Sequence, residues 1–287
     1  LNRPRPIQVA LYEVTAGEVK ASVANTRAGT VKACRRARMS PAMGGQIAGL
    51  PAREGALVKK GDILMELWNE DLKAQLVLTQ RETDASRART GEACATADVA
   101  DKESRRMLSL QSKGLASEEA VDVAVGKAKA SAAACGATRA MVRVSQAREV
   151  VAQAALERTL LRAPFDGSVA EVNGEIGEFV TPSPVGIPTP PAVDLIDNSC
   201  LYVTAPIDEV DAPAIRAGMP AKISLDAFPR TNFTGNVRRV APYVLDLEKQ
   251  ARTVEIEVEV AQLEELDLLA GYSADVEVVL QVRDLVG

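Results

Sequence analysis

The side chains that most often carry out chemistry are sparse in this sequence. Its 287 residues include no histidine, so the most common general base and metal ligand is missing. No nucleophile lies in a pattern with a base, and no carboxylate cluster stands out. The segment "GEIGEF" (174–179) is typical of a β-turn and does not open a helix, as a dinucleotide-binding loop would. We therefore predict a protein that is not an enzyme, with no catalytic residue, metal site or cofactor.

Composition and charge narrow the class further. The formal net charge is −5, and no basic block is present, which argues against a nucleic-acid partner. Aromatic residues make up 3% of the chain against 47% hydrophobic residues overall, which favours thin or elongated modules over one large core. No run of about 18 apolar residues occurs, so we predict no membrane-spanning helix within this sequence.

Two kinds of local pattern divide the chain. Residues 7–33 alternate between apolar and polar side chains, as half-buried strands do, and residues 39–69 combine short apolar runs with glycine-centred turns. From 70 to about 159 the chain has no proline and is rich in strong helix formers. Strand patterns resume at 161–180 and, after a proline-rich loop, at 201–286. The sequence thus predicts β-modules interrupted by a long helical insertion.

The helical insertion contains a turn that splits it into two arms. "KGLA" (113–116) is the predicted turn, and Ser117 is the predicted N-cap of the second arm. Small or apolar residues recur at spacings of 3 and 4 along both arms, which is typical of a heptad seam. We therefore predict an antiparallel helical hairpin whose seam, being made mostly of Ala, Ser and Thr, buries little apolar surface. The seam positions are Leu72, Leu76, Thr79, Thr83, Ser86, Thr90, Ala93, Ala97, Ala100, Ser104 and Met107 on the first arm, and Val121, Ala124, Ala128, Ser131, Cys135, Thr138, Val142 and Ser145 on the second.

This order of parts resembles the periplasmic adaptors, also called membrane fusion proteins (HlyD/MacA-like), of bacterial tripartite efflux systems. Residues 44–67 carry the Glu-Gly and Val-Lys-Lys-Gly-Asp run of the family's lipoyl-like module, and "APFDGSV" (163–169) matches the second half of that module. The segment 201–242, which ends in Phe-x-Gly-x-Val and a short tail, is similar to the family's β-barrel. In "LLAGYSADVEVVL" (268–280), Tyr272 stands where the family usually has Met.

The resemblance implies an elongated, multidomain α+β fold. The expected parts are N-terminal strands of a β-barrel (1–36), the first half of a split lipoyl-like, barrel-sandwich hybrid domain (37–69), a long antiparallel coiled-coil hairpin (70–160), the second half of the lipoyl-like domain (161–199) and the main part of the barrel (200–287). We expect the membrane anchor and a membrane-proximal domain to lie outside this sequence, and the protein to be periplasmic and anchored to the inner membrane through that missing segment.

The resemblance also assigns a role to the hairpin tip. Family members that dock on TolC-type outer-membrane channels carry Arg, then Leu four residues on, then Ser seven further. Arg106, Leu110 and Ser117 fit both intervals and coincide with the predicted turn. Arg106 and Leu110 would share one side of the first arm, one helical turn apart. The alternative is that Arg106 is only solvated and Ser117 only caps the helix.

Three lysines are candidates for more specific roles. "EDLKA" (70–74) is similar to the modified-lysine site of carrier proteins, but Lys73 falls at the base of the first helix instead of in a two-strand turn, which disfavours an acyl-carrier module. Lys59 and Lys60 are expected in a β-turn. In this family such module loops line the interior of the ring, so the two lysines are also candidates for pore-facing residues.

The four cysteines form no paired-cysteine metal motif, and free buried thiols are the first expectation. An oxidising compartment would allow disulfides. Cys94 and Cys135 lie at equal distances from the centre of the turn, although Cys94 is one residue off its seam. Cys34 and Cys200 would lie on the two strands that link the barrel and the lipoyl-like module. Both pairings are therefore alternatives to free thiols.

The resemblance implies an adaptor that links an inner-membrane transporter to a TolC-type channel, with several copies, six being expected, forming a ring or funnel. The barrel is most similar to adaptors of ABC-type macrolide exporters, and a resistance–nodulation–division (RND) pump is the second candidate. A type I secretion adaptor and a structural coiled-coil scaffold without a channel partner are further alternatives. The sequence names no exported substrate.

Overall fold

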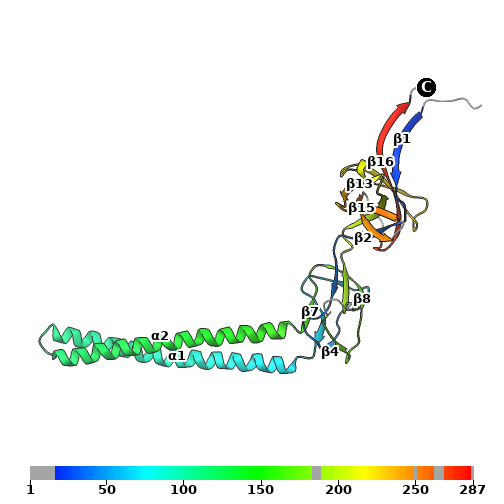
Figure 1. Cartoon of the computed structure of the whole chain (residues 1–287). Coiled ribbons are helices and arrows are strands. Elements are labelled where there is room, and N and C mark those ends of the chain that lie inside the picture. Colours follow the sequence, from blue (N-terminus) through cyan, green and yellow to red (C-terminus); the bar gives the residue numbers. More distant parts are fainter. Residues whose placement is uncertain (1–16, 183–188, 249–250, 262–267, 286–287) are drawn as a thin grey trace, which may run out of the picture. The chain divides into compact units, whose positions relative to one another are not determined.

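The computed structural model describes residues 17–182, 189–248, 251–261 and 268–285, and these form two compact units (Figure 1). The first unit combines the chain before residue 38 with the chain after residue 195, and the second contains residues 38–195. Two chain segments therefore pass from one unit to the other, which makes the second unit an insertion in the first.

The first unit is a closed antiparallel barrel. Six strands follow one another in the order β16-β12-β13-β15-β11-β2, and β2 returns to pair with β16 through Thr30 with Ser273 and Gly29 with Ala274. β1 pairs with the distal part of β16, and β14 pairs with β15. The elements are β1 (Gly17–Ala24), β2 (Gly29–Ala33), β11 (Leu201–Asp208), the 3-10 helix η1 (Ala212–Ala214), β12 (Pro220–Leu225), β13 (Asn232–Val240), β14 (Leu245–Glu248), β15 (Ala251–Val260) and β16 (Ser273–Leu285).

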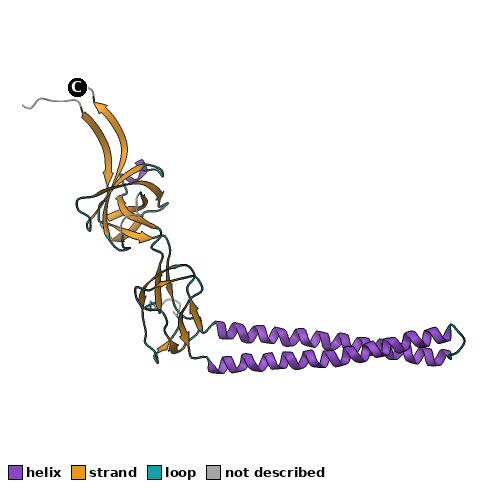
Figure 2. Cartoon of the chain, turned by 180° about the vertical axis from the view of Figure 1, so that it is seen from behind, coloured by secondary structure: helices purple, strands orange, loops and turns teal. Residues whose placement is uncertain are grey.

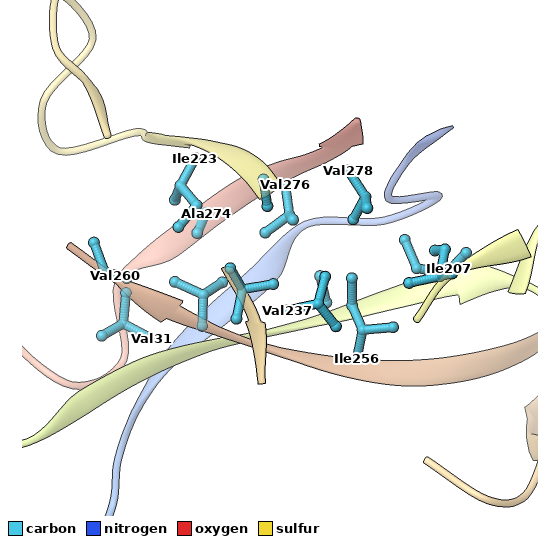
Figure 3. Packing of buried hydrophobic residues seen from close by; sticks show 14 of the residues in the cluster. Val31, Ile207, Ile223, Val237, Ile256, Val260, Ala274, Val276 and Val278 are labelled. Atoms are coloured by element: carbon cyan, nitrogen blue, oxygen red, sulfur yellow. The ribbon is translucent and has the colours of Figure 1, made fainter. Parts of the chain in front are cut away.

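Alternating side chains fill the barrel (Figure 3). On β12 every second residue is buried, and β13 continues the alternation through Phe233 and Val237. Ile207, Ile223 and Ile256 are completely buried. Tyr272, which replaces the family's usual Met, packs partly buried against this core, with its ring centroid 6.4 Å from that of Phe228. The core is thus aliphatic, as the low aromatic content requires.

The second unit contains a sandwich of two four-stranded sheets, β3-β10-β8-β5 and β7-β6-β4-β9. Each sheet combines strands that precede the helical insertion with strands that follow it, so neither half of the module is complete alone. Its core includes Ile47, Leu64, Met65, Val169 and Leu195. The strands are β3 (Arg36–Met39), β4 (Gly45–Gly49), β5 (Leu57–Val58), β6 (Ile63–Leu67), β7 (Leu160–Arg162), β8 (Gly167–Val172), β9 (Phe179–Val180) and β10 (Val193–Ile196).

Two long helices, α1 (Glu70–Gln111) and α2 (Glu118–Glu157), lie side by side in both views (Figures 1 and 2). Every predicted seam residue is buried or half-buried. Several seam hydroxyls bond within their own helix: Thr83 Oγ1 donates to Thr79 O at 3.0 Å and Thr90 Oγ1 to Ser86 O at 2.9 Å. Small side chains with internally satisfied hydroxyls let the two helices pack closely.

All four cysteines form disulfides, so the expectation of free thiols is wrong. Cys94 bonds Cys135 across the hairpin, with a Cα–Cα distance of 4.7 Å, and Cys34 bonds Cys200, with a Cα–Cα distance of 5.4 Å. A position one residue off the seam still points partly toward the other helix, and this lets Cys94 reach its partner.

The predicted α+β fold class, with a β-barrel, a split lipoyl-like module and a helical hairpin, is confirmed. Among the described residues, neither long helix has a stretch apolar enough to cross a membrane.

Candidate functional site

The turn at the hairpin tip ends α1 through backbone hydrogen bonds. Leu115 N donates to Leu110 O at 2.9 Å, and Gly114 N donates to Gln111 O at 2.8 Å. Gly114 has a φ of 71°, which a residue with a Cβ adopts at a cost. These are the contacts of a Schellman motif, in which a glycine just past the helix satisfies the last carbonyl groups. The sequence "KGLA" therefore forms the turn because its glycine supplies the required conformation.

Ser117 begins α2 as its N-cap, as the sequence predicted. Its side-chain oxygen accepts a hydrogen bond from Ala120 N at 3.2 Å, and Glu118 and Glu119 occupy the first helical turn, where negative charge is favoured. The side chain of Ser117 is nonetheless exposed. Its role as a cap leaves its outer surface free for contact with a partner.

Arg106 and Leu110 lie one turn apart on α1, which places them on one side of that helix. The side chain of Arg106 is 68% exposed and forms an ion pair with Glu103 at 3.0 Å. Leu110 is half-buried. The end of the hairpin thus presents a cation, an apolar side chain and a hydroxyl within a short stretch of chain.

Two further apolar side chains at the tip were missed in the sequence analysis. Leu115, in the turn itself, is 72% exposed, and Leu108, in the last turns of α1, is 46% exposed. Apolar residues so exposed at the end of a structural element are candidates for partner contact. The available signal was the leucine directly after Gly114, where a solvent-exposed turn would ordinarily carry a polar residue.

Hydrogen bonds of the buried residue Asn69, which is 2% exposed, connect the base of the hairpin to the sandwich. Its side-chain amide donates to Thr159 Oγ1 at 2.9 Å and to Glu66 Oε1 at 3.2 Å. Thr159 follows α2 and Asn69 precedes α1, so one side chain joins the two ends of the insertion. Lys73, in the first turn of α1, forms ion pairs with Glu70 at 2.9 Å and Glu66 at 3.2 Å.

Two hydrogen bonds raise the pKa of Lys73 and keep it protonated; the one to Glu70 has the larger effect and the one to Glu66 the smaller. It is therefore a helical, ion-paired lysine, in contrast to the lysine at a two-strand turn that carrier modules modify.

Lys59 and Lys60 lie in a tight turn after β5, as predicted, and both side chains are exposed. Asp62 Oδ2 accepts a hydrogen bond from Lys59 N at 2.9 Å, and Asp166 Oδ1 accepts one from Lys60 N at 2.6 Å. Asp166 belongs to the second half of the module. The two halves therefore fix this basic loop together, and Leu57 beside it is 85% exposed.

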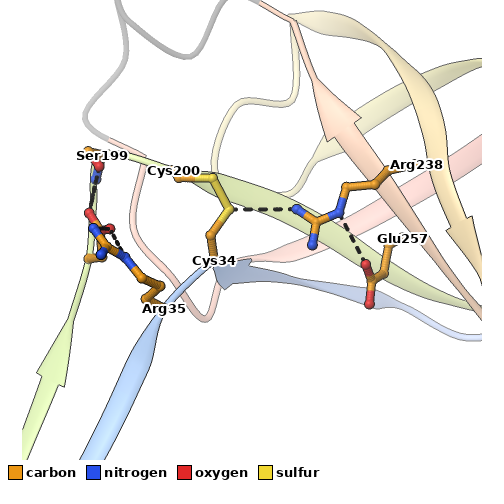
Figure 4. Close-up of a disulfide and its surroundings, with 7 residues drawn as sticks. Cys34, Arg35, Ser199, Cys200, Arg238 and Glu257 are labelled. Carbon is orange, nitrogen blue, oxygen red and sulfur yellow. Dashed lines mark hydrogen bonds and ion pairs between the residues drawn. A yellow bond between two sulfur atoms is a disulfide. The ribbon is translucent and has the colours of Figure 1, made fainter. Parts of the chain in front are cut away.

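A second polar cluster lies on the barrel beside the Cys34–Cys200 disulfide (Figure 4). Glu257, on β15, is 6% exposed. Its Oε1 accepts from Arg239 Nε at 2.9 Å, and its Oε2 lies 3.3 Å from Arg238 Nε. The pairing of β13 with β15 is interrupted between Val237 and Arg239, and this bulge leaves Arg238 as the extra residue. Two consecutive arginines can therefore both reach the same carboxylate.

Pairing with arginine lowers the pKa of two acids near the disulfide, Glu257 and Asp197, the second of which pairs with Arg35. Hydrogen bonding from Arg239 lowers the pKa of Glu257 despite the opposing effect of burial. Burial acts to raise the pKa of Asp197, but hydrogen bonds from Ser199 and Arg35 outweigh it and the pKa is lowered. Both acids are thus held as carboxylates. No group of three metal-binding side chains occurs among the residues that the structure describes.

Comparison with known proteins identifies similarities over most of the chain. Residues 201–281 match the family described as "CusB-like, beta-barrel domain". The chain is 30% identical over 243 residues to the multidrug resistance protein MdtN of Shigella flexneri, an alignment that covers 71% of this chain and 69% of that protein. It is 26% identical to the macrolide export protein MacA of Escherichia coli O157:H7, over 84% of this chain and 64% of the relative.

Solved structures have the same fold. The crystal structure of MacA from Actinobacillus actinomycetemcomitans superposes with a TM-score of 0.77, covering 95% of this chain and 83% of that one at 18% identity. The barrel, the split sandwich and the helical insertion therefore occur together, in one chain, in a protein of known structure.

Proposed function

Because the chain belongs to the family of periplasmic adaptors, or membrane fusion proteins, we propose that it couples an inner-membrane transporter to a TolC-type outer-membrane channel through the tip of its hairpin. Members of this family serve efflux as non-catalytic assembly proteins. The proposed mechanism is accordingly docking and conformational coupling, with the energy supplied by the transporter. Attachment to the inner membrane, which the family implies, belongs to the same proposal.

The tip of the hairpin carries this proposal. Arg106, Leu110 and Ser117 follow the spacing found in channel-docking adaptors, and the turn holds them at the end of two long helices. The exposed side chain of Leu115 extends the apolar part of this surface. An arginine beside exposed leucines is a combination that protein interfaces favour, since apolar anchors supply burial and the guanidinium supplies directional hydrogen bonds.

For the transporter we propose an ABC-type macrolide exporter as the first candidate and an RND pump as the second. The relative named for macrolide export supports the first, and the CusB-like description of the barrel leaves the second open. The relatives named for multidrug resistance and macrolide export support a drug or toxin as the cargo.

We further propose that six copies assemble into a ring, with Lys59 and Lys60 facing its interior. Exposed valines along the hairpin support lateral contacts between copies, because apolar side chains are stabilised when a neighbouring copy removes them from water. They are Val77, Val99, Val123, Val150 and Val151. Mass measurement of the detergent-extracted full-length protein tests the number of copies.

The decisive experiment compares Arg106→Asp with Arg87→Asp in a cell whose drug export depends on the full-length protein. Both arginines are exposed, and each pairs with an acid three residues away at 3.0 Å, but Arg87 lies far from the tip. Export and cross-linking of the tip to the channel should fall in Arg106→Asp and persist in Arg87→Asp at equal expression. Equal export in the two variants would refute docking through Arg106 and favour a scaffold.

Ser117 needs a variant that separates capping from docking. Ser117→Asp keeps an N-cap oxygen and so preserves the start of α2, whereas it changes the surface that a partner meets. Under the proposal this variant loses cross-linking with its helix content intact. Retained cross-linking would assign Ser117 to capping alone.

A further inference from the structure

The Cys34–Cys200 disulfide is unequally accessible at its two ends. Cys200, just before β11, is exposed, whereas Cys34, just after β2, is half-buried. Because Cys200 is the more exposed residue of the pair, we expect a thiolate arriving from solvent to attack at Cys200. Attack on one sulfur of a disulfide expels the other sulfur as a thiolate, so the accessible end determines which cysteine must leave.

Arg238 lies beside the sulfur that would leave. Its Nη1 is 3.7 Å from Cys34 Sγ, within hydrogen-bonding distance for sulfur (Figure 4). A guanidinium at this position stabilises a thiolate on Cys34, and a more stable leaving thiolate departs faster. The two asymmetries thus act together: access favours attack at Cys200, and charge favours departure of Cys34.

The guanidinium of Arg238 is held in place by its other contacts. Its Cζ lies 4.6 Å from the centroid of the Tyr202 ring, and its Nε lies 3.3 Å from Glu257 Oε2. Glu257 does not cancel the positive charge of the group, because Arg239 shares the same carboxylate. Two guanidinium groups facing one carboxylate leave a net charge of +1 beside Cys34. Nearby, Arg35 is paired with Asp197.

We propose that the Cys34–Cys200 disulfide is a thiol–disulfide exchange site, at which an external thiolate attacks Sγ of Cys200 and Arg238 stabilises the departing thiolate of Cys34. The attack forms a mixed disulfide on Cys200 and breaks the original S–S bond, whose electron pair passes to Cys34. When the reagent is a dithiol, its second thiolate resolves the mixed disulfide. The dithiol is then oxidised by two electrons and both cysteines are left as thiols.

Other contacts also join the two chain segments that this bond links. Cys34 N donates to Cys200 O at 2.9 Å, and the ladder of β2 and β11 continues from Ala33 and Leu201. Arg35 also bridges the same two chain segments, with Nε 2.8 Å from Asp197 Oδ2. These contacts keep the strands together after reduction, so exchange can be reversible without unfolding the barrel.

The test is to treat the purified chain briefly with reduced glutathione, quench it with acid, alkylate the freed thiols and map both modifications by mass spectrometry. Glutathione should be found on Cys200 and the alkyl group on Cys34, in a ratio of about five to one or more, as expected for a stabilised leaving thiolate. The Cys94–Cys135 disulfide, whose Cys135 is buried, is the internal reference and should open more slowly. Glutathione mainly on Cys34, or faster opening in the hairpin, would overturn the proposal.

Variants distinguish a specific role of Arg238 from the loss of any positive charge on the barrel. Arg238→Gln should slow exchange severalfold and reduce the preference for Cys200. Arg252→Gln removes the same charge from an exposed arginine of β15 that pairs with Glu209, at the other end of β11 from Cys200, and should change both far less. Arg238→Lys should retain part of the effect. Equal exchange in Arg238→Gln and Arg252→Gln would refute a specific role for Arg238. The wild-type distribution of glutathione decides the site of attack even if a variant is unstable.

Discussion

Cys94 on α1 and Cys135 on α2 lie opposite each other, with their Cα atoms 4.7 Å apart and their sulfurs bonded. At another height of the same hairpin, Ser86 Oγ and Ser145 Oγ share a hydrogen bond of 2.9 Å. Both contacts fix the register of one helix against the other. They matter because the seam is made of small side chains, which contribute little apolar burial per layer.

Removal of this disulfide should therefore destabilise the hairpin selectively. In Cys94→Ser/Cys135→Ser we expect the helices to lose about 2–4 kcal/mol of stability, as for disulfides that close loops of this size. Far-ultraviolet circular dichroism during thermal unfolding measures the change. The matched control is Cys34→Ser/Cys200→Ser, in which helix melting should stay at the wild-type temperature. Identical helix melting in the two double variants would contradict a special role for the hairpin bond.

The hairpin was the most predictable part of the fold. Spacings of 3 and 4 identified residues such as Thr79, Ala100 and Ser104 as seam positions, and all three are buried. The periodicity of one helix determines which face must be covered, so this information is local. Whether two cysteines bond depends on a distance between helices, and the sequence could name the pairs without deciding between bonded and free thiols.

The cluster around Glu257 was not predictable from the pattern of its strand. Glu257 alternates with Glu255 and Glu259 on β15, where a polar residue is expected to face solvent. It is buried because a bulge on the neighbouring strand brings Arg238 and Arg239 to it together. The bulge lies in β13 and the buried glutamate on β15, so the burial depends on how the two strands pair. The sequence of either strand alone does not show this pairing.

Because of Glu257, the free energy of unfolding of the barrel should decrease at acidic pH. Its pKa is lowered in the fold, so its contribution is complete above the unfolded value of about 4.3 and is lost as pH falls through the folded value. Urea unfolding between neutral and acidic pH should show this loss. Glu257→Gln should cost about 1.5–3 kcal/mol near neutrality, because it replaces the charge-assisted hydrogen bonds from Arg239 by weaker ones to a neutral amide. It should also flatten the acid dependence; an unchanged slope would contradict the assignment.

Two glycines should respond in opposite directions to the same substitution. A Cβ on Gly29 would lie 2.4 Å from Thr204 O and 3.0 Å from Ala274 O, the backbones of both strands that flank β2. Gly29→Ala should therefore destabilise the barrel by about 1–3 kcal/mol through overpacking at the point of closure. Gly91, on α1, has nothing within 4 Å, so Gly91→Ala should stabilise the helix by about 0.5–1 kcal/mol. Chemical denaturation of each variant measures both; a Gly29→Ala protein as stable as wild type would exclude the close strand approach.

Asn69 should control how firmly the hairpin is attached to the sandwich. Its amide donates to Thr159 and Glu66 while almost fully buried, so Asn69→Ala removes one donor from each of these partners and should cost about 1–3 kcal/mol. Hydrogen exchange should become faster for amides at the base, such as Lys73 N, which donates to Asn69 O at 2.9 Å. Amides of the tip, such as Leu115 N, serve as the control and should keep their wild-type rates. Acceleration spread evenly along both helices would mean that Asn69 stabilises the whole hairpin instead of its attachment.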